Sequence, residues 1–342
     1  MIQISEKDIN NLKDLIVQTK NPLIITHYNP DGDAMGSSLA FYHYLVKKGK
    51  VPTLVTPNDY PEFLHWLPGN EKVVVYKRNS GTVLNEIKKA DAIFGLDLND
   101  VDRTEGLEKY LNEAQGKKVL IDHHPDPGNF ADITISNTQY SSTAELVYHL
   151  IDSLGDSGLV GKTIAECLYT GIMTDTGSFN YNSSKPYTYA VVSKLIEKGV
   201  DKDKIFGKIY DNFSVDRMRL LGYCLSQKME VFPELNTAII GLTKKELKEF
   251  NFAPGDTEGF VNYPLSIKGV KFSAIFVEKN KGVKISFRSK GEFPANKFAE
   301  NHFGGGGHKN ASGGYSDESY EEALKKFRDL LPKYKKELND AL

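Results

Sequence analysis

The run Asp122-His123-His124 places a carboxylate and two imidazoles at three consecutive positions. It directly follows residues 118–121, an apolar stretch whose composition predicts a short buried strand. Carboxylate and imidazole groups bind metal ions or transfer protons, and packing of a hydrophobic core gives no reason to place them here. The run therefore indicates a reactive site at the carboxyl end of a strand.

A second group of candidates follows the first predicted strand, within residues 26–33. Pro30 and Gly32 predict a tight turn. Such a turn would let His27, Asp31 and Asp33 converge above the end of the strand. The simpler alternative is that Asp33 only caps a helix and Asp31 only belongs to the turn, and at this point it stays open.

Two further aspartates end predicted elements. Asp97 closes the apolar stretch 92–96, and Asp175 ends a predicted helix whose apolar residues include Ile164, Leu168 and Ile172. A single aspartate after a strand is commonly only a turn or cap residue. At a helix C-terminus, however, a carboxylate opposes the helix dipole at a cost of several tenths of a kcal/mol. Asp175 therefore calls for a nearby cation.

Together these residues predict a metal centre. Five carboxylates gathered at one edge of a sheet would repel one another, and some would have to stay protonated unless cations were present. The five are Asp31, Asp33, Asp97, Asp122 and Asp175. Two divalent ions resolve this conflict, and mixed carboxylate and imidazole ligands suit manganese better than magnesium alone. A pair of metals about 3.5–4 Å apart can activate water for phosphoryl transfer. The sequence therefore predicts a hydrolase of phosphate esters.

The elements that must position these residues form an α/β pattern. Strands are predicted at 23–26, 53–56, 72–76, 92–96, 118–121 and 133–136, and one intervening helix begins near Ala34. Short apolar strands that alternate with helices predict a parallel sheet with helices on both faces. Ligands of such sheets bind beyond the carboxyl ends of the strands.

The rest of the chain predicts a connector and a smaller α/β domain. Residues from about 143 to 228 are mostly helical in pattern, and one of these helices is opened by Ser142-Thr143. Strands return at 237–242, 271–278 and 283–289, followed by a glycine-rich loop at 304–307 and a helix from 320 to about 338. We expect a catalytic domain at 1–200, a helical connector at 201–230 and a second domain at 231–342, with the active-site cleft between the domains.

The composition of the chain excludes several classes of function. The 342 residues carry a net charge of -2, so there is no overall basic field to hold a long polyanion. The two cysteines cannot build a disulfide framework. The N-terminus lacks a secretory signal pattern, and no apolar run approaches the roughly 20 residues that span a bilayer. We expect a cytoplasmic protein with no membrane partner and a short rather than a long nucleic-acid substrate.

The order of the acidic motifs resembles the four motifs of the DHH phosphoesterase superfamily. These motifs are Asp31-x-Asp33, Asp97, Asp122-His123-His124 and Asp175. The resemblance implies a first metal held by His27, Asp31 and Asp97. It implies a second metal held by Asp33, His123 and Asp175, with Asp97 bridging the two ions. In the same family pattern Asp122 orients a histidine and His124 faces the scissile phosphate.

The predicted second domain strengthens the resemblance. Phe303 is followed by four glycines and then by His308-Lys309-Asn310-Ala311-Ser312, which is similar to the C-terminal domain of one DHH subfamily. There Gly305, Gly306 and Gly307 would let backbone N–H groups approach a phosphate that His308 also contacts.

Two arginines also match family positions. Arg288 would pair with a substrate phosphate, and its alternative is a solvated strand arginine. Arg103 also matches a family position, although a surface arginine fits as well.

Over nearly the whole chain the pattern is most similar to the group of bifunctional oligoribonucleases and 3′-phosphoadenosine 5′-phosphate phosphatases. That similarity implies a manganese-dependent phosphoesterase, with magnesium or cobalt as alternatives. It would hydrolyse short single-stranded RNA to mononucleotides and 3′-phosphoadenosine 5′-phosphate to AMP, by two-metal activation of a bridging water. One departure is Asn180, where many relatives carry arginine.

Alternatives remain at this stage. A pyrophosphatase or exopolyphosphatase would use the same metal ligands, and linear dinucleotides derived from cyclic-di-AMP would fit the same site. A non-catalytic nucleotide-binding module is the alternative outside the enzymes, but such a protein would be expected to lose metal ligands. A homodimer is also an open alternative.

Overall fold

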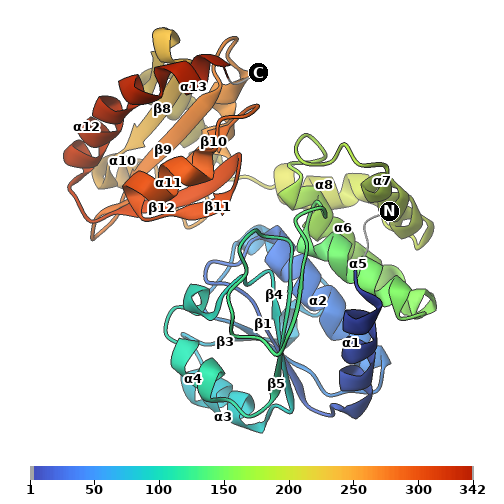
Figure 1. Ribbon diagram of the computed structural model, residues 1–342. Coiled ribbons are helices and arrows are strands. Elements are labelled where there is room, and N and C mark those ends of the chain that lie inside the picture. The colour runs from blue at the N-terminus through green and yellow to red at the C-terminus, as the bar shows by residue number, and fades with distance from the viewer. Residues whose placement is uncertain (1–3, 341–342) are drawn as a thin grey trace. The chain divides into compact units, whose positions relative to one another are not determined.

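The chain forms two compact units, Met1–Asn212 and Phe213–Leu342, in a computed structural model that describes residues 4–340 (Figure 1). Helix α8 (Lys202–Tyr210) lies in the first unit and helix α9 (Val215–Tyr223) in the second. The segment 201–230, which the sequence predicted to be a helical connector, is thus divided between the two units.

The first unit is built on a six-stranded sheet in which every neighbouring pair is parallel. Its strands are β1 (Pro22–Ile25), β2 (Thr53–Thr56), β3 (Val73–Val75), β4 (Ala92–Leu96), β5 (Lys117–Asp122) and β6 (Ile133–Ser136). All six predicted strands are therefore present. The spatial order β3-β2-β1-β4-β5-β6 places β1 beside β4, where the direction of winding reverses. Ligand sites of open α/β sheets lie at such a switch point.

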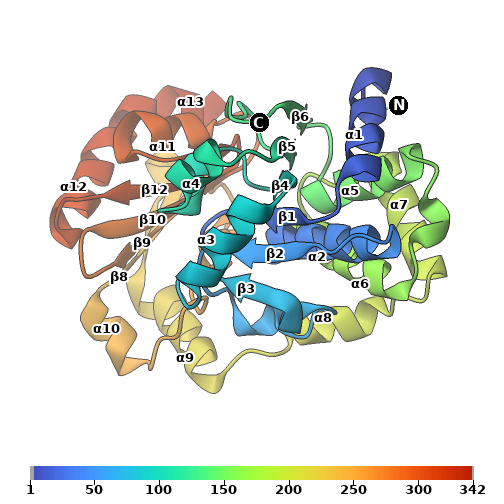
Figure 2. The same cartoon turned by 90° about the horizontal axis from the view of Figure 1, so that it is seen from below.

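Helices cover both faces of this sheet, as the sequence predicted (Figure 2). They are α1 (Glu6–Gln18), α2 (Gly32–Lys47), α3 (Ser80–Lys89), α4 (Glu108–Glu113), α5 (Thr143–Ser153), α6 (Lys162–Asp175) and α7 (Pro186–Glu197), together with α8. On one face Ile24 packs with buried residues of α1, α2, α5 and α6. On the other face Leu23 and Ile25 pack with buried residues of α3 and α4. The two sides of β1 thus belong to two different apolar cores.

Glycines bring the backbones of α2 and α6 into contact. A Cβ atom on Gly36 would lie only 2.6 Å from the carbonyl oxygen of Cys167. A Cβ atom on Gly171 would lie 2.5 Å from the Cβ atom of Ala144 and 2.7 Å from Asp33 Oδ1. Any larger residue at Gly171 would therefore push α6 away from α2 and from the start of α5.

The second unit contains a mixed sheet of order β11-β12-β10-β9-β8-β7, in which only β8 and β9 are parallel. The strands are β7 (Met229–Phe232), β8 (Thr237–Leu242), β9 (Phe272–Glu278), β10 (Val283–Ser289), β11 (Gly306–His308) and β12 (Ala311–Ser316). The three predicted strands are β8, β9 and β10. The prediction of a glycine-rich loop at 304–307 is wrong in part, because Gly306 and Gly307 pair with β12. Gly304 instead ends a helix with a φ of 53°.

Helices also cover this second sheet. One face packs against α11 (Ala295–Phe303), α12 (Tyr320–Leu330) and α13 (Lys335–Asp340) around a core rich in phenylalanine. The single helix predicted from 320 to 338 is interrupted by a 3-10 turn at Leu331–Tyr334, because Pro332 cannot continue an α-helix. On the other face α9, α10 (Lys244–Glu249) and the turn Phe260–Ser266 pack over β8 and β9.

The fold also bears on thiol reactivity and on membrane crossing. Cys167 and Cys224 are both buried, and burial raises the pKa of each thiol. In the described part of the chain, no helix combines the length and the apolar character that crossing a membrane would require.

Candidate metal centre

The structure brings the six predicted metal ligands to the carboxyl edge of the first sheet. They lie in the loop after β1, in the first turn of α2, in the loops after β4 and β5, and at the last position of α6. The six are His27, Asp31, Asp33, Asp97, His123 and Asp175. Because β1 and β4 are neighbours in the sheet, the residues that follow them meet at its switch point.

The ligand atoms fall into two groups that meet at Asp97. His27, Asp31 and Asp97 form one group, and Asp33, His123 and Asp175 form the other, with the donor atoms of each group within 4.8 Å of one another. Asp97 Oδ2 lies 3.7 Å from His27 Nε2, while Asp97 Oδ1 lies 3.6 Å from His123 Nε2. One oxygen of Asp97 thus faces each group, which is the arrangement of a bridging carboxylate.

The backbone conformation around Asp97 explains how its carboxylate is oriented. Asp97 and Asn99 both have left-handed backbone conformations, with φ values of 54° and 61°. Residues other than glycine rarely adopt this conformation, and it is concentrated at functional sites. The hydroxyl of Thr143 donates a hydrogen bond of 2.8 Å to Asp97 Oδ1. The turn and the first residue of α5 together fix the orientation of Asp97.

The two aspartates at the start of α2 have distinct roles. Asp31 is the N-cap, and its Oδ1 accepts hydrogen bonds of 3.0 Å from the backbone N–H groups of Asp33 and Ala34. The buried carboxylate of Asp33 instead accepts from the N–H groups of Thr143 and Ala144, at 2.6 and 2.9 Å. The alternative that Asp33 merely caps α2 is therefore wrong. Asp33 lies against the N-terminus of α5, where the helix dipole favours negative charge.

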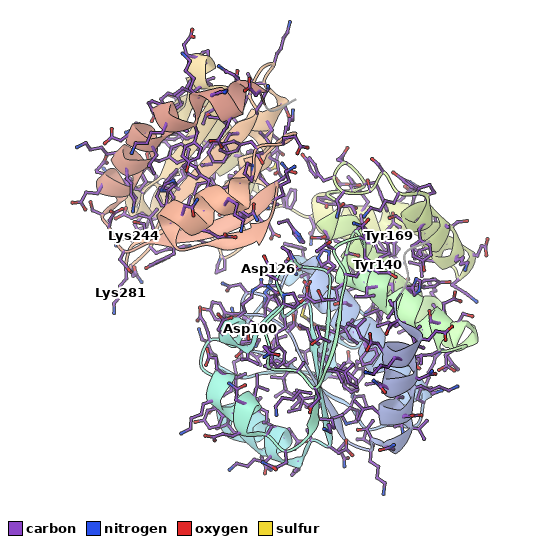
Figure 3. The ribbon with its side chains drawn as sticks, in the orientation of Figure 1. Asp100, Asp126, Tyr140, Tyr169, Lys244 and Lys281 are labelled. Carbon is purple, nitrogen blue, oxygen red and sulfur yellow. The ribbon has the colours of Figure 1, made fainter. Side chains whose placement is uncertain are left out.

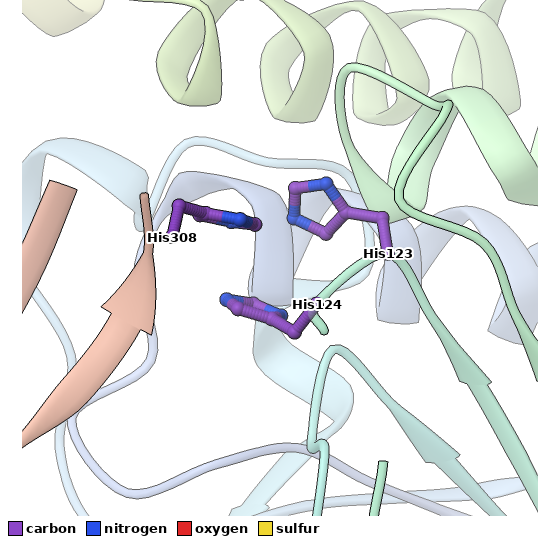
Figure 4. Close-up of side chains that lie close together, drawn as sticks. All are labelled: His123, His124 and His308. Atoms are coloured by element: carbon purple, nitrogen blue, oxygen red, sulfur yellow. The ribbon is translucent and has the colours of Figure 1, made fainter. Parts of the chain in front are cut away.

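Asp122 orients His124. Its Oδ1 accepts from both the backbone N–H and the ring Nδ1 of His124, each at 2.7 Å. Its Oδ2 accepts from the backbone N–H of Asn99 at 2.6 Å. Both oxygens of Asp122 are thus engaged by the protein. His123 and His124 project from the same loop with ring centroids 4.7 Å apart, and both rings are drawn in Figure 4.

The electrostatics of the cluster fit a cation site. Burial and then the charges of Asp97 and Asp175 raise the pKa of Asp33 well above its usual range. Burial raises the pKa of Asp175 to about 6, although His123 opposes the shift. The protein alone therefore does not stabilise all of these carboxylates in ionised form. Oxygen and imidazole donors with this uncompensated negative charge suit divalent metal ions.

The pKa of Asp97 is lowered, whereas the pKa of His124 is raised. Burial would raise the pKa of Asp97, but the hydrogen bond and the charge of His124 hold this pKa well below its usual value. Burial would lower the pKa of His124, yet its hydrogen bonds to Asp122 and Asp97 raise it well above its usual value. These contacts favour the protonated form of His124 beside the acidic cluster, and a protonated imidazole is suited to contact an anionic substrate.

Two other candidates lie near this edge. Arg103 is half-buried in the turn Val101–Thr104, and its carbonyl accepts a 2.7 Å hydrogen bond from the N–H of Tyr28, next to His27. The loops after β4 and β5 also carry Asp100 and Asp126 (Figure 3). Asn180 is exposed, and its amide donates to the carbonyl of Gly177 at 2.6 Å, closing the turn that follows Asp175.

The candidates of the second unit share one face of its sheet. Arg288 lies opposite Ala311 in the β10–β12 pair, and His308 lies opposite the same Ala311 in the β11–β12 pair. Directly opposed residues point to the same side of a sheet. The structure thus places Arg288 and His308 on either side of β12, on the face not covered by α11 and α12.

The three predicted glycines have different structural roles. A Cβ atom on Gly305 would lie 1.9 Å from the carbonyl oxygen of Gly313, and one on Gly307 would lie 2.7 Å from that of Ala311. Only glycine fits at these two positions because the strands approach so closely. Gly306 meets no atom within 4 Å, and it leaves the face beside His308 open.

Two residues of the centre had no signal of their own in the sequence. Thr143 contacts both groups of ligands, but its local sequence indicates only the start of a helix. Asn99 donates its side-chain N–H to the carbonyl of Pro125 at 3.3 Å and so joins the two loops that carry Asp97 and His124.

The comparisons with known proteins agree with this architecture. The model of the DHH family, N-terminal domain, matches residues 21–172, and the DHHA1 domain model matches residues 237–337. The bifunctional oligoribonuclease and PAP phosphatase NrnA of Thermus thermophilus is 30% identical over 324 residues, or 93% of each chain.

Solved structures show the same relationship. The crystal structure of an exopolyphosphatase-related protein from Bacteroides fragilis has 43% sequence identity and a TM-score of 0.95, over 99% of this chain and 100% of that one. RecJ of Thermus thermophilus in complex with Mn²⁺ shares the fold, with a TM-score of 0.57 at 13% identity, over 97% of this chain and 54% of RecJ.

A parallel sheet with carboxylate and imidazole side chains gathered at its switch point, together with these family matches, assigns the chain to the phosphoesterases, a class of hydrolases. The chain belongs to the DHH family and carries DHHA1 as its second domain.

Proposed function

We propose that this protein is a manganese-dependent phosphoesterase that hydrolyses short oligoribonucleotides to mononucleotides and 3′-phosphoadenosine 5′-phosphate to AMP. The observation that carries the proposal is the pair of ligand groups that meet at Asp97. Its support is the resemblance, along 93% of each chain, to a Thermus protein named for both activities. The mixture of carboxylate and imidazole donors favours manganese.

The two substrates pose the same chemical problem. Converting an RNA dimer to 5′-mononucleotides and converting 3′-phosphoadenosine 5′-phosphate to AMP both break a bond between phosphorus and a ribose O3′. In each case water supplies the oxygen that bonds to phosphorus, and O3′ leaves with a proton. A single site that reads a nucleoside with a 3′ phosphoryl group can therefore serve both reactions.

His27, Asp31 and Asp97 would hold one metal ion, and Asp33, His123 and Asp175 would hold the other, with Asp97 shared. When bound, two such ions supply positive charge to the phosphate oxygens and lower the pKa of water. The α5 N–H groups keep Asp33 in place, and the Thr143 hydroxyl keeps Asp97 in place. Misplacing Asp97 would alter both ligand groups, and misplacing Asp33 would alter the second.

His124 would contact the phosphate and provide the proton that leaves with O3′. Its Nδ1 is fixed by Asp122, so the ring keeps one orientation and can use Nε2 toward the substrate. In the second unit Arg288 and His308 would bind the 5′-phosphate of the same nucleoside. The guanidinium group of Arg288 can donate two parallel hydrogen bonds to a phosphate.

The proposal is tested with purified protein, with and without Mn²⁺, Mg²⁺ or Co²⁺. The substrates are RNA dimers to pentamers, 3′-phosphoadenosine 5′-phosphate, a linear adenylate dinucleotide, pyrophosphate and polyphosphate. We expect Mn²⁺-dependent release of mononucleotides and AMP. Turnover of pyrophosphate or polyphosphate alone would overturn the proposal.

Variants test the assigned residues. Asp122→Ala and His123→Ala are expected to lower the turnover of a 5′-phosphorylated RNA dimer by at least a hundredfold while circular dichroism stays native. Asp126→Asn is the matched control, because Asp126 is an exposed carboxylate on the same loop. Wild-type turnover in both Asp122→Ala and His123→Ala would remove the proposed chemistry.

A further inference from the structure

The face of the second sheet that carries Arg288 continues along β10 and β12 beyond the proposed phosphate site. Two residues from Arg288, Ser286 lies opposite Gly313, and two residues further Lys284 lies opposite Tyr315. Four residues of an antiparallel strand span about 13 Å. This length exceeds the separation of neighbouring phosphates in one nucleic-acid strand. We call Lys284, Ser286, Gly313 and Tyr315, with Lys279 at the adjoining turn, the β10–β12 strip.

Tyr315 provides a fixed aromatic surface at the far end of the strip. Its hydroxyl donates a hydrogen bond to the carbonyl of Lys281 in the β9–β10 turn. A Cβ atom on Gly282 would lie 2.7 Å from that hydroxyl oxygen and 2.9 Å from the ring carbon that bears it, so the end of the ring rests against the turn. Tyr315 is nevertheless 42% exposed. An exposed ring that is already held in place can stack a nucleobase at little entropic cost.

Three lysines lie in or next to the β9–β10 turn, on which the end of the Tyr315 ring rests. Lys279, Lys281 and Lys284 have no ionic partner within 4.0 Å among residues 4–340. Lys281 projects outward from the tip of the β9–β10 turn in Figure 3. Lys279 is half-buried, with its Nζ 5.4 Å from the ring centroid of Phe252. Burial and the positive charge of Lys284 both lower the pKa of Lys279. A local excess of positive charge therefore exists here, in a chain whose net charge is -2.

The middle of the strip leaves room for a ligand. Gly313 is exposed and has no side chain, and Ser286 is short. The residues that alternate with them along β10, Ile285 and Phe287, are buried in the core on the opposite face. Between Arg288 and Tyr315, the described residues of this face thus include no acidic side chain and no large apolar side chain.

We propose that the β10–β12 strip binds the further nucleotides of an oligoribonucleotide whose phosphate occupies the Arg288–His308 site. A base would stack on Tyr315, and phosphates would lie beside Lys284 and Lys279. The inference rests on the proposed function and extends it, because it assigns the protein a binding site for substrates longer than a dimer. 3′-Phosphoadenosine 5′-phosphate is too short to reach Tyr315 from that site.

The experiment compares kcat/KM for a 5′-phosphorylated RNA pentamer with kcat/KM for 3′-phosphoadenosine 5′-phosphate. In Tyr315→Ala we expect the ratio of the two values to fall about tenfold, because stacking on an aromatic ring strengthens binding by that order. Tyr315→Phe keeps the ring and should retain most of the ratio. Lys284→Ala should reduce the salt dependence of pentamer binding by about one phosphate contact.

Lys245→Ala is the matched control, because Lys245 is an 87% exposed lysine on α10 outside the strip. Its ratio should equal that of the wild type. An unchanged ratio in folded Tyr315→Ala, together with an unchanged salt slope in Lys284→Ala, would overturn the inference and leave the strip as solvated surface. Wild-type protein that hydrolyses neither RNA nor 3′-phosphoadenosine 5′-phosphate would overturn the proposed function instead.

Discussion

At the scale of single residues, Asp97 is the side chain on which the centre converges. One of its oxygens faces His27, and the other faces His123 and accepts the hydroxyl of Thr143. A carboxylate that would be shared by two metal ions must hold two directions at once, and a residue on a flexible loop would lose conformational entropy to do so. The left-handed turn and the bond from α5 set this orientation before any ligand binds.

Thr143 is therefore expected to control metal affinity without contacting a metal. Thr143→Val removes the hydroxyl but keeps the side-chain shape, and we expect Mn²⁺ affinity to fall about tenfold, since hydrogen bonds to charged groups contribute about 1.5–3 kcal/mol. The Asp33 contacts use backbone N–H groups and should persist. Isothermal titration with Mn²⁺ measures the change. Thr143→Ser restores the hydroxyl and should bind as the wild type does; equal affinity in Thr143→Val would contradict this role.

The gathering of the six side chains could be predicted because each stands near the end of an apolar strand or helix, where acidic residues and histidines are conspicuous. Thr143 could not, because its importance comes from a contact with Asp97 made through the tertiary fold. The different hydrogen-bonding roles of Asp31 and Asp33 could not be predicted from the sequence either. Both fit a helix N-cap by residue type, and only the position of α5 shows that Asp31 caps α2 while Asp33 accepts the N–H groups of α5.

At the scale of elements, the contact between α2 and α6 determines where two of the proposed ligands lie. Asp33 is in the first turn of α2 and Asp175 ends α6, so their separation depends on how closely the two helices approach. Gly36 and Gly171 allow backbone contact at this crossing. The distance of 3.6 Å between His123 Nε2 and Asp175 Oδ2 depends on the same approach.

Gly171→Ala is expected to disturb both stability and the centre. The added methyl group would overlap Ala144 and the Asp33 carboxylate, and overpacking of this kind costs about 1–3 kcal/mol. Chemical denaturation should show this loss, and Mn²⁺ titration should show weaker binding. Gly81→Ala on α3 is the control, because its new methyl group meets no atom within 4 Å. If Gly171→Ala were as stable as Gly81→Ala, the crossing would not depend on the glycine.

Elements with strong local patterns could be predicted, whereas those formed by pairing could not. The parallel strands of the first unit are apolar runs bounded by turn residues, so all six were predicted. Strands β11 and β12 consist largely of glycine, serine and alanine, which have little preference for strands. They become strands because β10 offers an edge to pair with, which is information that no local window contains.

At the scale of the whole molecule, the proposed metal ligands all belong to the first unit, and each unit has its own apolar cores. Metal binding should therefore stabilise one unit selectively. The repulsion that raises the pKa values of Asp33 and Asp175 would be relieved only there.

Differential scanning calorimetry can measure this selectivity. We expect Mn²⁺ to shift one unfolding transition to higher temperature and to leave the second nearly unchanged, with EDTA reversing the shift. Ligand at a hundredfold excess over its dissociation constant stabilises a folded unit by about 2.7 kcal/mol. His123→Ala is the control and should show a much smaller shift. Equal shifts of both transitions, or none, would contradict a metal centre confined to the first unit.

The burial of both cysteines has a practical consequence for spectroscopy. Thiols react as thiolates, and neither Cys167 nor Cys224 is exposed or easily ionised. A cysteine introduced at Val51 and another at Val215, which are 71% and 65% exposed, would be the accessible thiols in the described chain. Maleimide dyes could then be attached without removing the native cysteines. Each unit could in this way carry one dye at a chosen position.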